Sequence, residues 1–186
     1  MRLLGAPIAA GFVLLVCVLC SGCGQARPQA ILQTEKGTLV IELYPDAAPK
    51  TVENFATLID QGFYDGLIFH RYEPGFVIQG GDPKGDGTGG PGWKLYGEFQ
   101  DPVLLAKMPA HEKGVVAMAR RGNDPDSAGS QFYICLNPDP DRYAHLNAKY
   151  TTFGRVVKGM DVVDQLLKGD RIEKMTLKGY SPQKSQ

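Results

Sequence analysis

Short segments with the two-residue period of β-strands dominate the sequence after residue 30. Between residues 38 and 43, the apolar side chains of Leu39, Ile41 and Leu43 alternate with other residues, which is the pattern of a half-buried strand. Similar short runs follow at 67–70, 76–79, 114–119, 132–135, 152–157 and 171–177. Only residues 49–62 and 160–168 have helical periodicity, and each segment ends at or before a glycine. Many strands with two separate helices predict a closed antiparallel barrel capped by the helices, and argue against a doubly wound sheet.

The amino terminus has the composition of an export signal. Arg2 precedes a mostly apolar stretch over residues 3–19, and no Asp or Glu occurs before Glu35. Ser21-Gly22-Cys23 resembles the lipobox of bacterial lipoproteins, in which the cysteine is lipidated and becomes the first mature residue. A plain signal peptide or an uncleaved anchor is the alternative. We expect a signal peptide at 1–22, lipidated Cys23 with a linker to residue 30, one domain at 31–180 and a tail at 181–186.

Lipidation would hold the domain close to a membrane of the cell envelope. Residues 24–30 reach at most about 25 Å when extended, at about 3.5 Å per residue. Cys23 would carry acyl chains such as palmitate, and the absence of Asp after it favours the outer membrane, facing the periplasm, if the cell has two. The alternative is a secreted or periplasmic soluble protein. We expect a monomer.

Charge and cysteine content restrict the partners and the redox chemistry. Lys and Arg together number 20, as do Asp and Glu, so the chain lacks the basic excess typical of nucleic-acid binding. After removal of residues 1–22 and lipidation of Cys23, Cys135 is the single remaining thiol, and no disulfide can form within the mature chain. Because Cys135 lies in an apolar run, we interpret it as a buried structural thiol and not as a nucleophile.

Several motifs suggest other functions, but the residues around them exclude these functions. Residues 80–92 contain seven glycines and a formal GxGxxG match, but a dinucleotide site needs this motif to open a helix, and here Pro91 and Gly92 follow. His70, His111 and His145 lack the spacing of a zinc site. Ser130 has no nucleophile-elbow motif around it. We expect no metal and no cofactor.

Two clusters of polar and aromatic residues carry the functional information. They read FHRYEPGFVIQGGD at 69–82 and SAGSQFYI at 127–134. Both strings resemble those of cyclophilin-type peptidyl-prolyl isomerases, and the resemblance extends over about residues 31–180. It implies an eight-stranded closed antiparallel barrel with two capping helices, and isomerisation of X-Pro bonds by stabilising the twisted amide. The expected substrates are proline-containing stretches of exported proteins.

The resemblance also implies roles for individual residues. Arg71 would be catalytic, donating to the prolyl nitrogen that regains its lone pair when the amide twists, and Gln79 would hold Arg71 and bind the substrate backbone. The implied substrate-binding residues are Phe76, Val77, Ala119, Arg120, Gln131, Tyr133, Leu146 and Tyr150. Without the resemblance, the apolar members of this set would be interpreted as core residues.

The remaining expectations concern drug binding at His145 and two alternative functions. His145 stands where a tryptophan of the family contacts cyclosporin, so we expect weakened binding of that drug. A peptide-binding chaperone module that uses the same groove is the alternative function, and a purely structural envelope lipoprotein is a second one. Activity on a short X-Pro peptide separates the three.

Overall fold

The computed structural model describes residues 26–182, so Cys23 and the expected signal peptide at 1–22 lie outside the described residues. The strands are β1 (Gln29–Thr34), β2 (Gly37–Leu43), β3 (Arg71–Glu73), β4 (Val77–Gly80), β5 (Val115–Met118), β6 (Phe132–Cys135), β7 (Thr152–Lys158) and β8 (Ile172–Lys178). The α-helices are α1 (Pro49–Asp60), α2 (Pro102–Leu105) and α3 (Met160–Val163), and the 3-10 helices are η1 (Glu98–Gln100) and η2 (Pro140–Tyr143). The first strand thus begins at Gln29, ahead of the boundary at residue 31.

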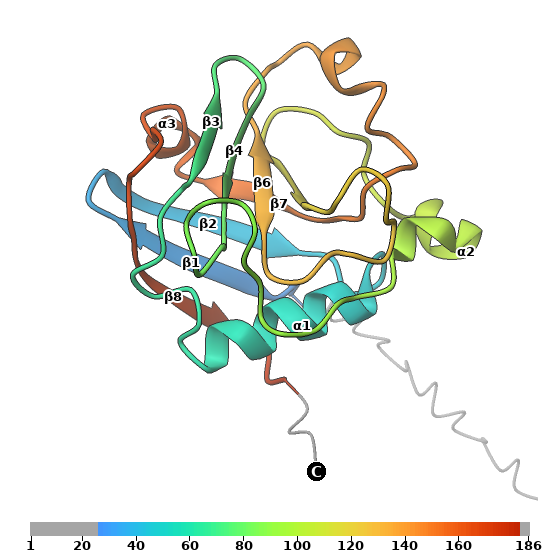
Figure 1. Ribbon diagram of the computed structural model, residues 1–186, viewed down its shortest axis with the longest axis horizontal. Coiled ribbons are helices and arrows are strands. Elements are labelled where there is room, and N and C mark those ends of the chain that lie inside the picture. The colour runs from blue at the N-terminus through green and yellow to red at the C-terminus, as the bar shows by residue number, and fades with distance from the viewer. Residues whose placement is uncertain (1–25, 183–186) are drawn as a thin grey trace, which may run out of the picture.

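The eight strands form one antiparallel sheet in the order β3-β4-β6-β5-β7-β2-β1-β8, which curls around the core (Figure 1). Its edge strands β3 and β8 do not pair with each other, and the segments before them meet at a bridge between Ile68 and Arg171. The expected closed barrel is therefore wrong: the structure is an open, curled half-barrel. Around this bridge the N–H of Phe69 donates to the backbone oxygen of Asp170, and the N–H of Ile172 donates to that of Leu67. The two edges therefore meet ahead of the three-residue strand β3, which is itself not paired with β8.

Alternation along β4, β5 and β6 divides their side chains between the two faces of the sheet. One set packs into the main core with α1: Ile78, Val116, Met118, Phe132 and Ile134. The other set gathers in a second buried cluster: Val77, Ala117, Tyr133 and Cys135, joined by Tyr143 and Leu146. The second cluster lies beneath the cavity described below.

Helix α1 is capped by a residue from a distant part of the chain. Pro49 occupies its first turn, where a missing N–H has no consequence. The backbone N–H groups of Lys50 and Thr51 donate to the buried carboxylate of Glu98, at 2.8 and 2.9 Å. The apolar face is buried as its periodicity predicts, through Val52, Phe55, Ala56 and Ile59. Figure 1 shows α1 running along the end of the sheet formed by β1, β2 and β8.

Two expected elements are shorter than the sequence predicts. Residues 67–70 contribute only the bridge at Ile68 and not a strand. The helix expected at 160–168 is α-helical only as α3. Beyond it the N–H groups of Gln165 and Leu166 donate to the carbonyls three residues back, and the N–H of Leu167 donates at 2.8 Å to the side chain of Asp170. Such a side-chain acceptor competes with the helical hydrogen bond. Helix α2 is not among the expected helices, and Asp101 caps it.

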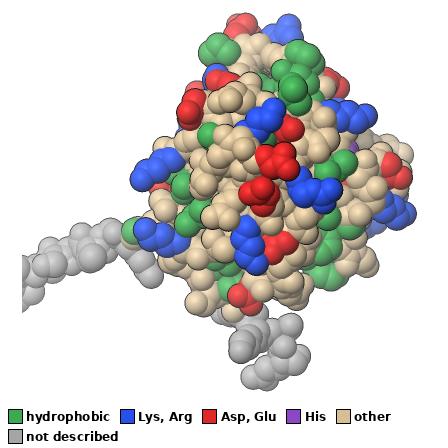
Figure 2. Space-filling view, turned by 90° about the vertical axis from the view of Figure 1, so that its left-hand side faces the viewer, with side chains coloured by type: hydrophobic (Ala, Val, Ile, Leu, Met, Phe, Trp, Pro, Cys, Tyr) green, Lys and Arg blue, Asp and Glu red, His purple; other side chains and the backbone are tan. Residues whose placement is uncertain are grey.

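The exterior carries both signs of charge, in keeping with 20 basic and 20 acidic residues. Figure 2 shows a face on which Lys and Arg side chains alternate with Asp and Glu, and hydrophobic side chains are scattered. Within residues 26–182, none of the helices is both long and apolar enough to cross a membrane.

Candidate active site

A row of directly opposed residues crosses four strands and defines the site. Arg71 on β3 pairs with Gln79 on β4, Gln79 with Tyr133 on β6, and Tyr133 with Ala117 on β5. Opposed residues of antiparallel strands place their side chains on the same face, with Cβ atoms about 5 Å apart. The β3–β4 hairpin therefore brings the charged fork of Arg71 beside an amide, and the next strand places an aromatic ring beside that amide.

A chain of hydrogen bonds fixes how these amides point. Arg71 Nη1 donates to Gln79 Oε1 at 3.0 Å, and Gln79 Nε2 donates to Gln131 Oε1 at 2.9 Å. Gln131 Nε2 donates to the backbone oxygens of Gly87 and Gly89, at 3.0 and 2.9 Å. Because those two carbonyls can only accept, they set the orientation of both glutamines. Gln79 must then present its oxygen to Arg71.

The 82–89 loop that supplies these carbonyls is organised by Asp82. The carboxylate is buried and accepts from the backbone N–H groups of Lys84, Asp86 and Gly87. Burial raises the pKa of Asp82, but the N–H donors outweigh it and the net shift is downward. The glycine-rich segment is thus an ordered loop that supplies hydrogen-bond acceptors to the site.

Glu73 holds the other side of the Arg71 guanidinium. Arg71 Nε donates to Glu73 Oε1 at 3.0 Å, and Nη2 donates to the same oxygen. Together with the bond to Gln79, these contacts use three of the five N–H groups of Arg71. One N–H on Nη1 and one on Nη2 stay free of the described residues.

The sequence-predicted residues line one cavity of about 300 Å³ beside this guanidinium. Its lining consists of Arg71, Phe76, Val77, Gln79, Ala119, Arg120, Tyr133, His145, Leu146 and Tyr150. Gln131 is the one predicted site residue outside this lining, and it joins the set through its bond to Gln79. Most of the lining side chains are apolar or aromatic, and the bonded pair of Arg71 and Gln79 adds polar atoms, so the cavity suits a small apolar ring next to a polar backbone.

The hydroxyl of Tyr133 is bound beneath the cavity. It lies 2.8 Å from His111 Nε2, and His111 Nδ1 lies 2.9 Å from Asn147 Oδ1. The backbone N–H of His111 also donates to Asn147 Oδ1, so this oxygen is an acceptor and Nδ1 carries the proton. Tyr133 then donates to Nε2. Burial lowers the pKa of His111 and raises the pKa of Tyr133.

Arg120 is held in place without an acidic partner. Nε donates to the backbone oxygen of Lys149 at 2.8 Å, and Nη1 donates to those of Arg121 and Gly122. Its guanidinium carbon also lies 4.5 Å from the centre of the Tyr150 ring, in cation–π range. The charge of Arg120 therefore has a fixed place at the rim of the cavity.

Two residues that suggest other chemistry have structural roles. Cys135 is fully buried, and burial raises the pKa of its thiol to about 12, which agrees with the interpretation as a structural thiol. Ser130 is buried and its hydroxyl donates to the backbone oxygen of Gly81 at 2.6 Å. Neither side chain is available as a nucleophile.

Sequence reasoning missed three residues that shape the site: Glu73, Asp82 and His111. Glu73 lies two positions from Arg71 on a strand, so a period-two reading could have paired them. His111 gave no such signal, because its partners Tyr133 and Asn147 are distant in sequence.

Known proteins are similar to this chain in sequence and in fold. The family model "Cyclophilin type peptidyl-prolyl cis-trans isomerase/CLD" matches residues 30–180. A peptidyl-prolyl cis-trans isomerase of Synechococcus elongatus is 47% identical over 146 residues, covering 77% of this chain and 92% of that protein. Peptidyl-prolyl cis-trans isomerase B of Bacillus subtilis is 45% identical over 138 residues, covering 74% and 89%. A Cryptosporidium parvum cyclophilin type isomerase, crystallised with the dipeptide Ala-Pro, has a TM-score of 0.70 and 29% identity, covering 81% and 98%.

The curled sheet of eight antiparallel strands, with a cavity beside the guanidinium of Arg71, places the chain in the class of cyclophilin-like β-proteins. Within that class, the chain belongs to the cyclophilin-type peptidyl-prolyl cis-trans isomerase family. Its activity is the cis–trans isomerisation of peptide bonds that precede proline.

Proposed function

We propose that Arg71 is the catalytic residue and that the 300 Å³ cavity holds the proline ring of the substrate. The single observation that carries this proposal is the convergence of Arg71, Gln79 and the apolar side chains on one cavity. Rotation about an X-Pro bond must overcome a barrier of about 18–20 kcal/mol because amide resonance is lost. Catalysis requires tighter binding of the twisted amide than of either planar isomer.

Arg71 supplies the group that distinguishes the twisted state. When the amide twists, the prolyl nitrogen becomes pyramidal and regains a lone pair that can accept a hydrogen bond. The free N–H groups on Nη1 and Nη2 are positioned donors, because Glu73 and Gln79 fix the plane of the guanidinium. A positioned donor acts without reorganisation at the moment of reaction.

The remaining predicted residues hold the substrate. Phe76, Val77, Tyr133 and Leu146 form the apolar walls for the ring, and Tyr150 closes the side next to Arg120. Gln79 offers its second Nε2 proton to the substrate backbone, and Gln131, whose Nε2 protons bind Gly87 and Gly89, lines the neighbouring part of the site. Ala119 and Arg120 flank the residue that precedes proline.

We further propose that the chain acts on exported proteins as a lipid-anchored enzyme of the cell envelope, in its lipoprotein form. The support is the signal-like segment at 1–22 followed by Cys23. Residues 24–28 separate Cys23 from β1 and span about 20 Å when extended. The anchored domain would therefore meet polypeptides close to the membrane from which they emerge.

The test is isomerisation of a short X-Pro peptide by the full-length protein in detergent. We expect acceleration by the wild-type protein and a loss of about 100-fold in kcat/KM for Arg71→Ala, the lower end of the effect of removing a transition-state donor. Arg142→Ala, an exposed arginine of η2, serves as the matched control. Wild-type activity in a folded Arg71→Ala variant would remove Arg71 from the catalytic role.

A further inference from the structure

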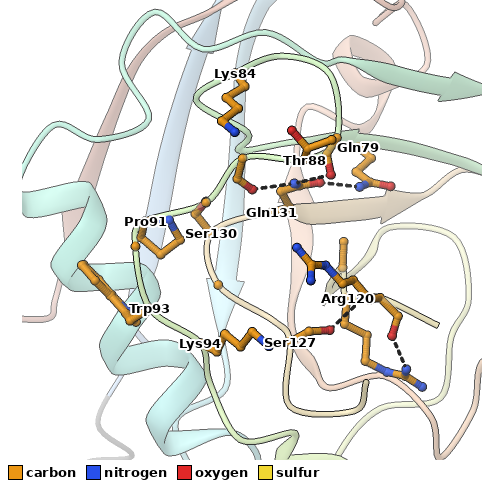
Figure 3. A pocket seen from close by; sticks show the side chains of 17 residues that line it. Gln79, Lys84, Thr88, Pro91, Trp93, Lys94, Arg120, Ser127, Ser130 and Gln131 are labelled. Carbon is orange, nitrogen blue, oxygen red and sulfur yellow. Dashed lines mark hydrogen bonds between the residues drawn. The ribbon is translucent and has the colours of Figure 1, made fainter. Parts of the chain in front are cut away.

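A second, larger cavity opens beside the proline cavity. Its volume is about 610 Å³, and it shares Gln79, Ala119 and Arg120 with the smaller one. Figure 3 shows its side chains converging from the 84–94 loop on one side and from the 120–131 segment on the other. The two cavities are therefore adjacent, and the residues that precede a proline bound in the first can extend toward the second.

All the charged side chains that line the larger cavity are positive: Lys84, Lys94, Arg120 and Arg121. Lys94 is already paired with Asp124 at 2.8 Å. In the described part of the chain, no ion pair links Lys84, Arg120 or Arg121 to a carboxylate. This single-sign lining contrasts with the mixed charges on the face in Figure 2.

The nearby carboxylates already accept hydrogen bonds from groups of the protein. Asp82 is buried and bound to backbone N–H groups. Asp86 accepts from the backbone and hydroxyl of Thr88. Asp124 accepts from Lys94 and from the backbone of Asp126. None of the three carboxylates lines the cavity. Asp86 attracts Lys84 and Asp124 attracts Arg121 from outside the lining, but the charged side chains that face a bound peptide are positive.

Arg120 places part of this charge at the junction of the two cavities. Its hydrogen-bond partners are neutral backbone oxygens, and the Tyr150 ring covers its guanidinium. A cation held by neutral groups keeps its full charge for a substrate. The residue before proline lies beside Ala119 and Arg120 in the proposed binding mode, and one further residue of an extended chain adds about 3.3 Å.

We infer that the larger cavity selects an acidic side chain at the second residue before proline, which makes Glu-X-Pro and Asp-X-Pro segments preferred substrates. This inference rests on the proposed placement of the substrate in the smaller cavity. Opposite charge attracts the correct peptide during approach and like charge repels a basic one. The lining cations are partly exposed, so salt weakens the effect.

The experiment compares three peptides that differ only in having Glu, Gln or Lys at the second position before proline. With the full-length protein at low ionic strength, we expect kcat/KM to fall in the order Glu, Gln, Lys, with about 5-fold between neighbours. In 1 M NaCl the three values should converge, because the Debye length shrinks to about 3 Å.

Two variants test whether the cations of the larger cavity cause the preference for an acidic side chain. The double variant Lys84→Gln, Arg121→Gln should lose most of the Glu-over-Lys ratio while it keeps turnover of the Gln peptide. Lys158→Gln, on an exposed position of β7 outside the lining, is the control for charge change and should keep the ratio. Equal values for the three peptides at low salt, or an unchanged ratio in the double variant, overturn the inference. Absence of activity on every peptide would instead contradict the proposed function.

Discussion

Arg71 and Glu73 lie on one face of β3, and both Nε and Nη2 of the arginine donate to the same carboxylate oxygen of the glutamate. Glu73 lines neither cavity, so it holds the guanidinium from the side away from the substrate. The arginine is thus oriented by one carboxylate and one amide before any peptide binds.

Removal of the Glu73 carboxylate should therefore misplace Arg71. We expect Glu73→Ala to lower kcat about 10-fold with a small change in KM, since loss of alignment acts mainly on the reacting geometry. Glu73→Gln should recover most of the activity, because an amide oxygen still accepts from the guanidinium. Steady-state kinetics test this positioning role. The control is Glu173→Ala, on an exposed part of β8. Equal kcat for Glu73→Ala and the wild-type protein would contradict a positioning role.

Stability should decrease as the pH falls below about 6.5, the ordinary pKa of histidine. Burial lowers the pKa of His111 and of His70 in the folded protein, so the unfolded chain binds more protons over this range. The stabilisation is complete above pH 6.5 and declines until the pH reaches the lowered pKa values. The electrostatic interaction with His145 also lowers the pKa of His111.

Urea denaturation between pH 5 and 8 measures this slope. We expect His111→Gln to flatten it in part, and a second substitution, His70→Gln, to flatten the remainder. If the single variant has the same slope as the wild-type protein, His111 does not contribute to the pH dependence.

Glu98→Ala should destabilise the fold without changing the chemistry of the site. The buried carboxylate accepts from the N–H groups of Lys50 and Thr51 and from the Thr51 hydroxyl, and its loss leaves these donors unpaired. A lost cap of this kind costs about 1–2 kcal/mol. Chemical denaturation gives the value, with Glu35→Ala in the exposed β1–β2 turn as the control. A change below that of the control would mean that α1 needs no cap from Glu98.

Cyclosporin should bind weakly, and His145→Trp should strengthen its binding. His145 is exposed at the rim of the smaller cavity and stacks on Phe76 with ring centroids 5.9 Å apart. An indole at this place adds a hydrogen-bond donor and a larger face, worth about 1–3 kcal/mol or roughly 5–150-fold in affinity. Paired inhibition curves measure the change, and we expect kcat/KM on a small peptide to change less. Superimposed inhibition curves would mean that His145 does not cause the weak binding of cyclosporin.

Cys23→Ser should release the protein from membranes or block its processing. Stable attachment needs two or more acyl chains, and serine offers no thiol for them. Membrane fractionation and mass spectrometry of the mature amino terminus test this. A Cys23→Ser variant that stays membrane-bound at wild-type size would exclude lipidation at this residue.

The sequence could predict what depends on local pattern. Alternation at 38–43 and 132–135 located strands, and the spacing of Val52, Phe55 and Ile59 located α1. The strings around Arg71 and Gln131 identified the family, and through it the residues that meet at the smaller cavity. That set could not be derived from periodicity, because cavity walls and core residues share the same apolar pattern.

Features that depend on contacts between residues far apart in the sequence could not be predicted. The Tyr133–His111–Asn147 chain forms only when β6 and two loops are in place. The open seam depends on how the segments around Ile68 and Arg171 meet, and these segments are far apart in the sequence. Likewise, α3 gives way to turns in which Gln165 and Leu166 donate to the carbonyls three residues back, although the apolar pattern continues.

The place of β1 in the sheet has a consequence for biogenesis. β1 lies between β2 and β8, and Gln29 pairs with both Glu42 and Lys178. The strand nearest to the amino terminus therefore keeps one unpaired edge until the last strand of the chain arrives. A chain that emerges from its amino-terminal end cannot complete its sheet from that end, and contacts of such large sequence separation form slowly. If the proposed export takes place before folding, the domain reaches its active form only after its carboxyl-terminal strand has followed the rest of the chain.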